Sequence, residues 1–348
     1  MSMSLGLGLG LTHRRGTSLA ALIRALFAND ETGVWLAPSD STTLFQDAAG
    51  TTPAGIGDPV RLALDKSQGL VLGGEQQGAG VLTVQGTGTG TYNASTGVGK
   101  IERIDIESRS GVEFSDLVAG GYYEVDIENG ASSTLSLAVR SPFLGSGQIS
   151  GPIGAGARVK QLVKLAAGST RFYVTDNGGS GTASITIHSV RELPGNHALA
   201  PSDAARPLVV EVDGNIAIRR DLIDDRLDVT LPAITNGKII IGTTQGVWVD
   251  DLNFAGGTFS LGPTTYTGGP AGLYEAIGAD ELGAIILDRQ PTEAELDTVF
   301  KWFKSKGAPV NLIAPLVLTS PNGTVFRTAE GRVLVRGTRT VTQEQSSG

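Results

Sequence analysis

The chain has 348 residues, of which 49 are glycine, and it carries a formal net charge of −8 with only 18% charged residues. This low charge, beside 40% hydrophobic residues, argues against intrinsic disorder, and the absence of cysteine excludes disulfides and thiolate metal sites. The acidic balance and the lack of a long basic run argue against nucleic-acid binding. No apolar run reaches about 18 residues, so we expect no membrane insertion. Glycine-rich turns between short apolar runs favour a mainly β chain.

Residues 1–32 combine an alternating arm with a predicted amphipathic helix. Leucine occupies every second position of the arm, which is strand periodicity, at Leu5, Leu7, Leu9 and Leu11. We interpret the arm as a strand added to a partner subunit, with a loose tail as the alternative. Residues 17–28 predict a helix with Leu22 and Leu26 on its apolar face. That face needs a partner, either the body of the same chain or a neighbouring subunit.

Residues 33–75 predict an extended adapter segment that contains Trp35 as an anchor and no catalytic constellation. Turn residues at 38–40 and 50–53 separate its short apolar patches. The pattern W-x-x-P-S-D, LFQD, G-T-T-P, G-D-P-V and L-D-K-S resembles a segment near the N-termini of tailed-bacteriophage virion proteins. This resemblance implies a structural or binding role on a virus particle, with Trp35 and the apolar residues of 1–32 serving assembly.

Residues 76–196 predict a β-sandwich, because alternating apolar runs are separated by turns rich in glycine, asparagine and aspartate. The expected strands cover 101–107, 121–128, 134–140, 158–166, 170–175 and 183–190. The GYYEV run at 121–125 and the S-V-R-E-L-P-G-N-H-A run at 189–198 resemble a carbohydrate-binding-module type of jelly roll found in phage virion proteins. That resemblance implies a module that binds glycans.

Residues 197–312 predict a second β-sandwich that ends in a helix over 292–307. The run at 221–227 and the L-D-R-x-x-T-E-A-E-L run at 287–296 resemble a concanavalin/laminin-G-like domain of phage proteins. Thr292 and Glu295 form the pattern of a capping box.

Residues 313–348 predict a β-hairpin appendage and a mobile tail. The expected fold class is therefore mainly β, with two jelly-roll-like sandwiches, an N-terminal arm plus short helix, and a helix before a small β tail.

The densest group of potential metal ligands is a set of four carboxylates within eight residues. Calcium binds six to eight oxygen ligands of this kind, so the set is a weak calcium candidate: Asp221, Asp224, Asp225 and Asp228. The spacing is not that of an EF-hand, and nearby arginines could neutralise the charges. We therefore favour structural or solvent-exposed carboxylates, and we expect no cofactor.

The aromatic residues supply the weak candidates for glycan contact. Tyr122 and Tyr123 are neighbours on a predicted strand, so one ring points inward and the other outward. Trp248 is a further candidate, because sugars stack on aromatic rings. The three histidines lie far apart and no nucleophile motif is present. We predict no catalytic residues and no enzyme.

These interpretations lead to a virion structural protein of a tailed bacteriophage, assembled in the host cytoplasm. The first hypothesis is a tail fibre or tail-tip appendage, a homotrimer that contacts tail or baseplate proteins and a host surface glycan. A second hypothesis is a capsid decoration or head-spike protein that contacts the major capsid protein and has no receptor role. A third is a polysaccharide-degrading tail spike, although the sequence offers no catalytic constellation for it.

Overall fold

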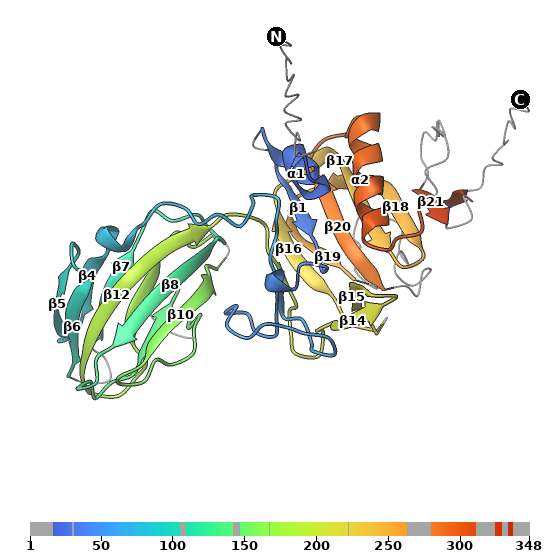
Figure 1. The fold of residues 1–348 in the computed structure, drawn as a ribbon. Coiled ribbons are helices and arrows are strands. Elements are labelled where there is room, and N and C mark those ends of the chain that lie inside the picture. Colours follow the sequence, from blue (N-terminus) through green and yellow to red (C-terminus); the bar gives the residue numbers. More distant parts are fainter. Residues whose placement is uncertain are drawn as a thin grey trace, which may run out of the picture.

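The computed structural model (Figure 1) describes residues 17–29, 31–104, 109–141, 147–166, 168–221, 223–262, 280–310, 324–328 and 333–336. Over these residues the fold is mainly antiparallel β, arranged as two sandwiches with a short helix near the start and a longer one near the end. The predicted fold class is confirmed. The alternating arm, with Leu5, Leu7, Leu9 and Leu11, lies outside the described residues.

The first sandwich is built from two sheets whose strands all come from residues 81–193. Its five-stranded sheet has the order β10 (Arg158–Lys164), β8 (Tyr122–Asn129), β12 (Gly181–Leu193), β6 (Val98–Arg103), β5 (Thr89–Asn93). Its four-stranded sheet has the order β4 (Val81–Gln85), β7 (Arg109–Phe114), β11 (Phe172–Asp176), β9 (Leu137–Arg140). Alternate residues of both sheets form one core, which includes Val112, Ile127 and Val174.

The second sandwich uses the residues on both sides of the first. One sheet has the order β14 (Leu208–Val212), β15 (Asn215–Arg219), β20 (Glu281–Leu287), β17 (Ile234–Thr243), β18 (Gly246–Phe254), β21 (Thr324–Thr328), β22 (Val333–Arg336). The facing sheet has the order β19 (Gly257–Leu261), β16 (Leu227–Leu231), β13 (Ala198–Leu199), β3 (Leu62–Ala63), β2 (Leu44–Phe45). The predicted appendage thus extends the larger sheet, because β21 pairs with β18.

Segment 33–75, which we expected as an extended adapter, contributes strands to both sheets of the second sandwich. Its β1 (Gly33–Leu36) pairs antiparallel with β20, so that Trp35 lies opposite Ile285. Its β2 and β3 pair with each other, and β3 pairs with β13. The second sandwich therefore begins before the first and is completed after it. The first sandwich is an insertion in the second.

Two helices cover the outer face of the larger sheet (Figure 1). The first, α1 (Leu19–Arg24), continues as a 3-10 turn over Ala25–Phe27, and the second is α2 (Glu293–Ser305). The predicted capping box of Thr292 and Glu295 is confirmed. Further 3-10 turns cover Ser41–Thr43 and Gln77–Ala79. None of the described helices is both long and apolar enough to span a membrane.

These two helical segments, which we call the helix layer, pack on the larger sheet through large apolar side chains. Phe303 of α2 lies so close to Gly242 of β17 that a β-carbon there would collide with the ring, so only glycine allows this approach. Ile23 and Leu26 of the N-terminal helical segment are buried in the same cluster as Phe303. The apolar face of this segment is therefore covered by the same chain, which was one of the two partners considered.

Candidate functional site

The two sandwiches are connected by two chain segments, 65–75 and 193–197, which together we call the joint. The Gly73 amide donates to the Glu192 carbonyl at 2.8 Å, so the segments run side by side. The Glu75 carboxylate accepts from the Val190 amide at 2.7 Å and from Arg191 Nε at 3.0 Å. Burial opposes ionisation of Glu75, but these hydrogen bonds outweigh it and hold the Glu75 pKa at about 2.

Asp65 is the centre of the joint. Its side chain is 0% exposed and accepts hydrogen bonds from the amides of Trp35, Ser67 and Asn196 at 2.7, 2.8 and 2.8 Å. The Ser67 hydroxyl adds a fourth at 2.7 Å. Burial raises the pKa of Asp65, and the donors oppose that rise. One carboxylate thus connects β1 with both segments of the joint.

His197 completes this network as a neutral imidazole. Its Nδ1 accepts from the Asp65 amide at 2.9 Å, so the remaining proton resides on Nε2, which lies 3.3 Å from the Leu193 carbonyl. The ring packs edge-on against Tyr122 with centroids 4.7 Å apart. Burial lowers the His197 pKa to about 4, because an imidazolium here would lose its hydration.

Trp35 is buried between the larger sheet of the second sandwich and the helices that cover it. Its ring is 3% exposed and packs edge-on against Trp302 of α2, with centroids 5.7 Å apart. Lys66 Nζ lies 5.2 Å from the Trp35 ring centre and pairs with Asp40. The W-x-x-P-S-D and L-D-K-S motifs therefore contact each other directly.

The other residues predicted for assembly divide by exposure. Leu26 is buried against the helix layer, whereas Leu22 is 38% exposed. Of the assembly residues that the structure describes, Leu22 is thus the one whose side chain reaches the surface. Assembly through any of them stays a prediction.

The three aromatic candidates have no ring face open to solvent. Tyr123 is 0% exposed in the core of the first sandwich, and its hydroxyl accepts from the Val118 amide at 2.8 Å. Trp248 is buried between the sheets of the second sandwich. Tyr122 points outward from its sheet, as the alternation requires, but the second sandwich covers it. It belongs to a small apolar cluster at the joint with Leu62, Leu64, Leu162 and Leu193.

The aspartate cluster divides into a turn and a separate residue. Asp221, Asp224 and Asp225 bring carboxylate oxygens within 4.8 Å of one another. Asp221 Oδ1 accepts from three amides, those of Ile223, Asp224 and Asp225, at 2.8 to 3.3 Å. These bonds lower the Asp221 pKa.

Asp225 and Asp228 also accept hydrogen bonds within the protein. Asp225 Oδ2 accepts from the Asp221 amide at 2.8 Å, and burial raises the Asp225 pKa. Asp228 stands apart on β16 and accepts from the Ser260 hydroxyl at 2.6 Å. The carboxylates of 221 and 225 therefore stabilise their own turn, and calcium binding stays a prediction.

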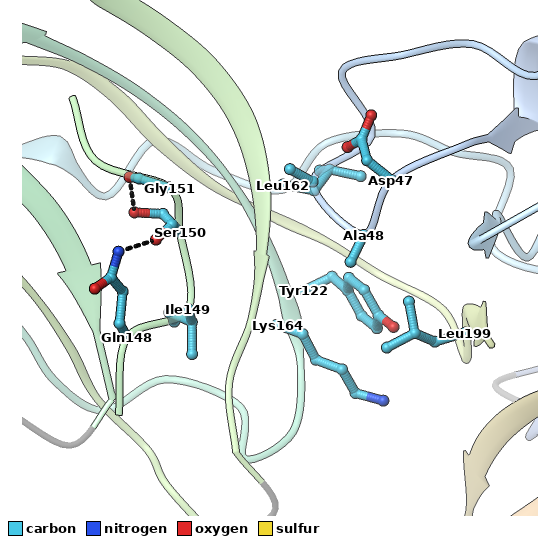
Figure 2. Close-up of a pocket in the computed structure, with 11 residues that line it drawn as sticks. Asp47, Ala48, Tyr122, Gln148, Ile149, Ser150, Gly151, Leu162, Lys164 and Leu199 are labelled. Carbon is cyan, nitrogen blue, oxygen red and sulfur yellow. Dashed lines mark hydrogen bonds between the residues drawn. The ribbon is translucent and has the colours of Figure 1, made fainter. Parts of the chain in front are cut away.

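A pocket of about 420 Å³ opens beside the joint (Figure 2). Tyr122 of β8 and Lys164 of β10 form one wall, and the loop that contains Asp47 forms another. The Leu162 amide, on the edge of β10, donates to the Ala49 carbonyl of that loop at 2.7 Å. Its remaining lining residues are Ala48, Gln148, Ile149, Ser150, Gly151 and Leu199.

Sequence reasoning identified Tyr122 but not the pocket around it. Lys164 occupies an outward position of a predicted strand, where lysine is ordinary. Nothing in the sequence indicates that the loop at 47–49 crosses the edge of β10. The one available signal was indirect, because the L-D-K-S motif lies just before the inserted sandwich and the P-G-N-H-A run just after it.

Comparisons with known proteins give only weak structural similarity. No protein family model matches the chain, and no curated protein matches it. Among solved structures, the N-terminal CBM22-1-CBM22-2 tandem domain of Xyn10C from Paenibacillus barcinonensis, a tandem of carbohydrate-binding modules, aligns with 13% sequence identity and a TM-score of 0.25. The alignment covers 70% of this chain and 95% of that chain.

Proposed function

We propose that the chain is a structural protein of a tailed-bacteriophage virion, a tail fibre or tail-tip appendage that contributes to host glycan binding. The observation that carries the proposal is the convergence of the phage-like motifs on the joint. Asp65 of L-D-K-S accepts from the amides of Trp35 and Asn196, which belong to two other motifs. Residues that resemble virion proteins thus fix both connecting segments to β1, which supports an architectural role.

The proposed mode of action is binding without catalysis. In this proposal the second sandwich attaches to tail or baseplate proteins, and the inserted sandwich is held away from the attachment. Three copies in a homotrimer would present three equivalent glycan sites, so that weak contacts add to a strong attachment. Exposed Leu22 and the arm at 5–11 are the proposed contacts between subunits.

The first test is cryo-EM localisation of the chain on intact particles with a bound antibody fragment. We expect density at the tail tip or its fibres. Density on the head would contradict the tail assignment and favour the capsid-decoration alternative. Absence of the chain from purified particles would contradict the virion assignment.

The second test addresses glycan binding and uses the purified full-length chain on a glycan array. We expect retention on a subset of bacterial polysaccharides, together with a trimer mass in light scattering. A reducing-sugar assay on the retained polysaccharide serves as the control, and release of sugar would contradict the non-catalytic proposal. An array without any retained glycan would contradict the receptor role.

A further inference from the structure

The pocket beside the joint is lined by one lysine, Lys164. Lys164 is half-buried on β10, with Nζ 5.3 Å from the centre of the Tyr122 ring. Among the residues that the structure describes, no carboxylate forms an ion pair with Lys164; Asp228 acts on it at longer range. Burial lowers the Lys164 pKa, since an ammonium group loses hydration there. An anion in the pocket would offset this cost.

The opposite rim of the pocket offers hydrogen-bond acceptors. Asp47 lies across the pocket from Lys164 (Figure 2). Its carboxylate is fixed by the amides of Thr51 and Thr52 at 3.1 and 2.6 Å. The Thr51 hydroxyl adds a third hydrogen bond at 3.1 Å. An ionised carboxylate has about four lone-pair sites, so acceptor capacity remains for one hydroxyl group of a ligand.

The surface between these two polar ends is mainly apolar. It is formed by Ala48, Ile149, Leu162 and Leu199. Small-molecule sites typically measure about 300–1,000 Å³ and combine apolar walls with a few placed polar groups. The volume of about 420 Å³ lies within that range. The C–H face of a sugar ring fits such a wall. The polar groups at the two ends of the pocket, Lys164 and Asp47, would distinguish the substituents of that ring.

We propose that this pocket binds one residue of a carboxylated sugar, of the uronic acid class. The sugar carboxylate contacts Lys164 Nζ, the ring packs on Leu162 and Leu199, and one ring hydroxyl donates to Asp47. This inference rests on the proposed glycan-binding function and narrows it to acidic glycans. It also gives the covered Tyr122 a role, because its ring positions the Lys164 ammonium at the pocket wall.

The test compares two ligands and four proteins by NMR titration of the full-length chain. Galacturonic acid and galactose differ in the carboxylate, so their affinity ratio isolates the Lys164 contact. The variants are Lys164→Met, which removes the charge and keeps the stem, and Ala48→Phe, which fills the pocket from an exposed loop position. Lys160→Met is the matched control, because Lys160 lies on the same strand and pairs with Glu124 at 2.9 Å.

We expect wild type and Lys160→Met to bind galacturonic acid about tenfold or more tightly than galactose. A factor of this size is the typical contribution of a hydrogen bond to a charged group. Lys164→Met should lose that preference, and Ala48→Phe should bind neither sugar while keeping the wild-type melting temperature. Equal binding of both sugars by wild type, or unchanged preference in Lys164→Met, would overturn the inference. Failure of galacturonic acid to bind would also overturn it, whereas a positive glycan array would leave the proposed receptor function intact.

Discussion

Asp65 illustrates how one buried residue fixes both connecting segments to β1. A carboxylate removed from water is unfavourable unless donors replace its hydration. Here three amides and one hydroxyl do so, and they come from β1 and from both connecting segments. The geometry connects each segment with the other two, because the Trp35 amide donates to Oδ1 and the Asn196 amide to Oδ2 of the same carboxylate. The joint is therefore a single cooperative unit.

Replacing Asp65 should destabilise the second sandwich and the joint together. In Asp65→Ala, the amides of Trp35, Ser67 and Asn196 lose their acceptor, and we expect a loss of about 3 kcal/mol or more in unfolding free energy. Urea unfolding followed by tryptophan fluorescence measures it. Asp203→Ala is the control, because the Asp203 side chain is 84% exposed and its ion pairs exceed 3.5 Å. A loss equal to the control would contradict the role of Asp65.

His197 predicts a specific pH dependence of stability. Its pKa is about 4 in the folded chain against 6.5 for a free imidazole, so the unfolded chain binds the proton first as the pH falls. The contribution of His197 to the free energy of unfolding is therefore complete above pH 6.5 and decreases as the pH falls toward 4. As the pH falls from 7.5 to 4.5, we expect protonation of His197 in the unfolded chain to lower the free energy of unfolding by about 2–3 kcal/mol.

The measurement is the pH dependence of urea unfolding in wild type and two variants. His197→Gln should have a flatter dependence between pH 7.5 and 4.5 than wild type. His188→Gln is the control and should keep the wild-type slope, because His188 is exposed beside Glu128. If His197→Gln also kept that slope, the neutral imidazole assigned to the joint would be incorrect.

At the scale of elements, the N-terminal helix is part of the body of the protein. Arg289 strengthens its contact with α2, because the guanidinium binds Glu295 at 2.7 Å and Glu31 at 3.2 Å. It also donates to the Leu26 carbonyl at 3.2 Å. This bridge fixes the end of the first helix against the start of the second.

Two leucines on the first helical segment provide a matched test of its packing against the body of the protein. Leu26→Ala should lower the unfolding free energy by about 2–4 kcal/mol, because it leaves a cavity beneath the helix layer. Leu22→Ala, at a 38% exposed position, should change it by less than about 0.5 kcal/mol. Light scattering of both variants then reports on oligomerisation. Equal destabilisation by the two variants would contradict the packing of α1 on α2.

The elements that the sequence predicted are those with a strong local signal. The capping box of Thr292 marked the start of α2, and alternating valine, isoleucine and tyrosine marked β8 and β12. The strands β4, β5 and β7 were missed because glycine, serine and threonine interrupt their alternation. Strands β1, β2 and β3 span two to four residues, which is too short for a period to appear, so their place in the second sandwich depends on tertiary pairing.

At the scale of the whole molecule, the insertion places the ends of the first sandwich next to each other. The contact between Gly73 and Glu192 is a single hydrogen bond of 2.8 Å. The first sandwich also has its own core, separate from that of the second. These two features are typical of domains that tolerate excision.

We expect the fragment 74–192 to fold alone, and the remaining chain to fold when residues 73 and 193 are joined by a short glycine linker. Circular dichroism and heat-induced unfolding of both fragments measure this. The second fragment should be the less stable, because excision uncovers Leu62, Leu64 and Leu193. A disordered first fragment would show that its fold depends on the joint.

The candidate pocket could not have been predicted from sequence, because it depends on how the two sandwiches pack against each other. Its walls come from segments more than 70 residues apart, with Asp47 on one side and Tyr122 and Lys164 on the other. Each residue alone has an ordinary local explanation. The relation between them arises from the insertion, which places the edge of β10 against a loop of the other sandwich.

The double connection also determines how the molecule responds to mechanical load. A module attached through one peptide can swivel about it, and a pull on such a module is carried by that single chain. Here the tension divides between two antiparallel segments, whose hydrogen bonds at Gly73, Glu75 and Asp65 resist sliding in shear. Torque on the inserted sandwich is thus passed to β1 and, through Trp35 and Trp302, to the helix layer.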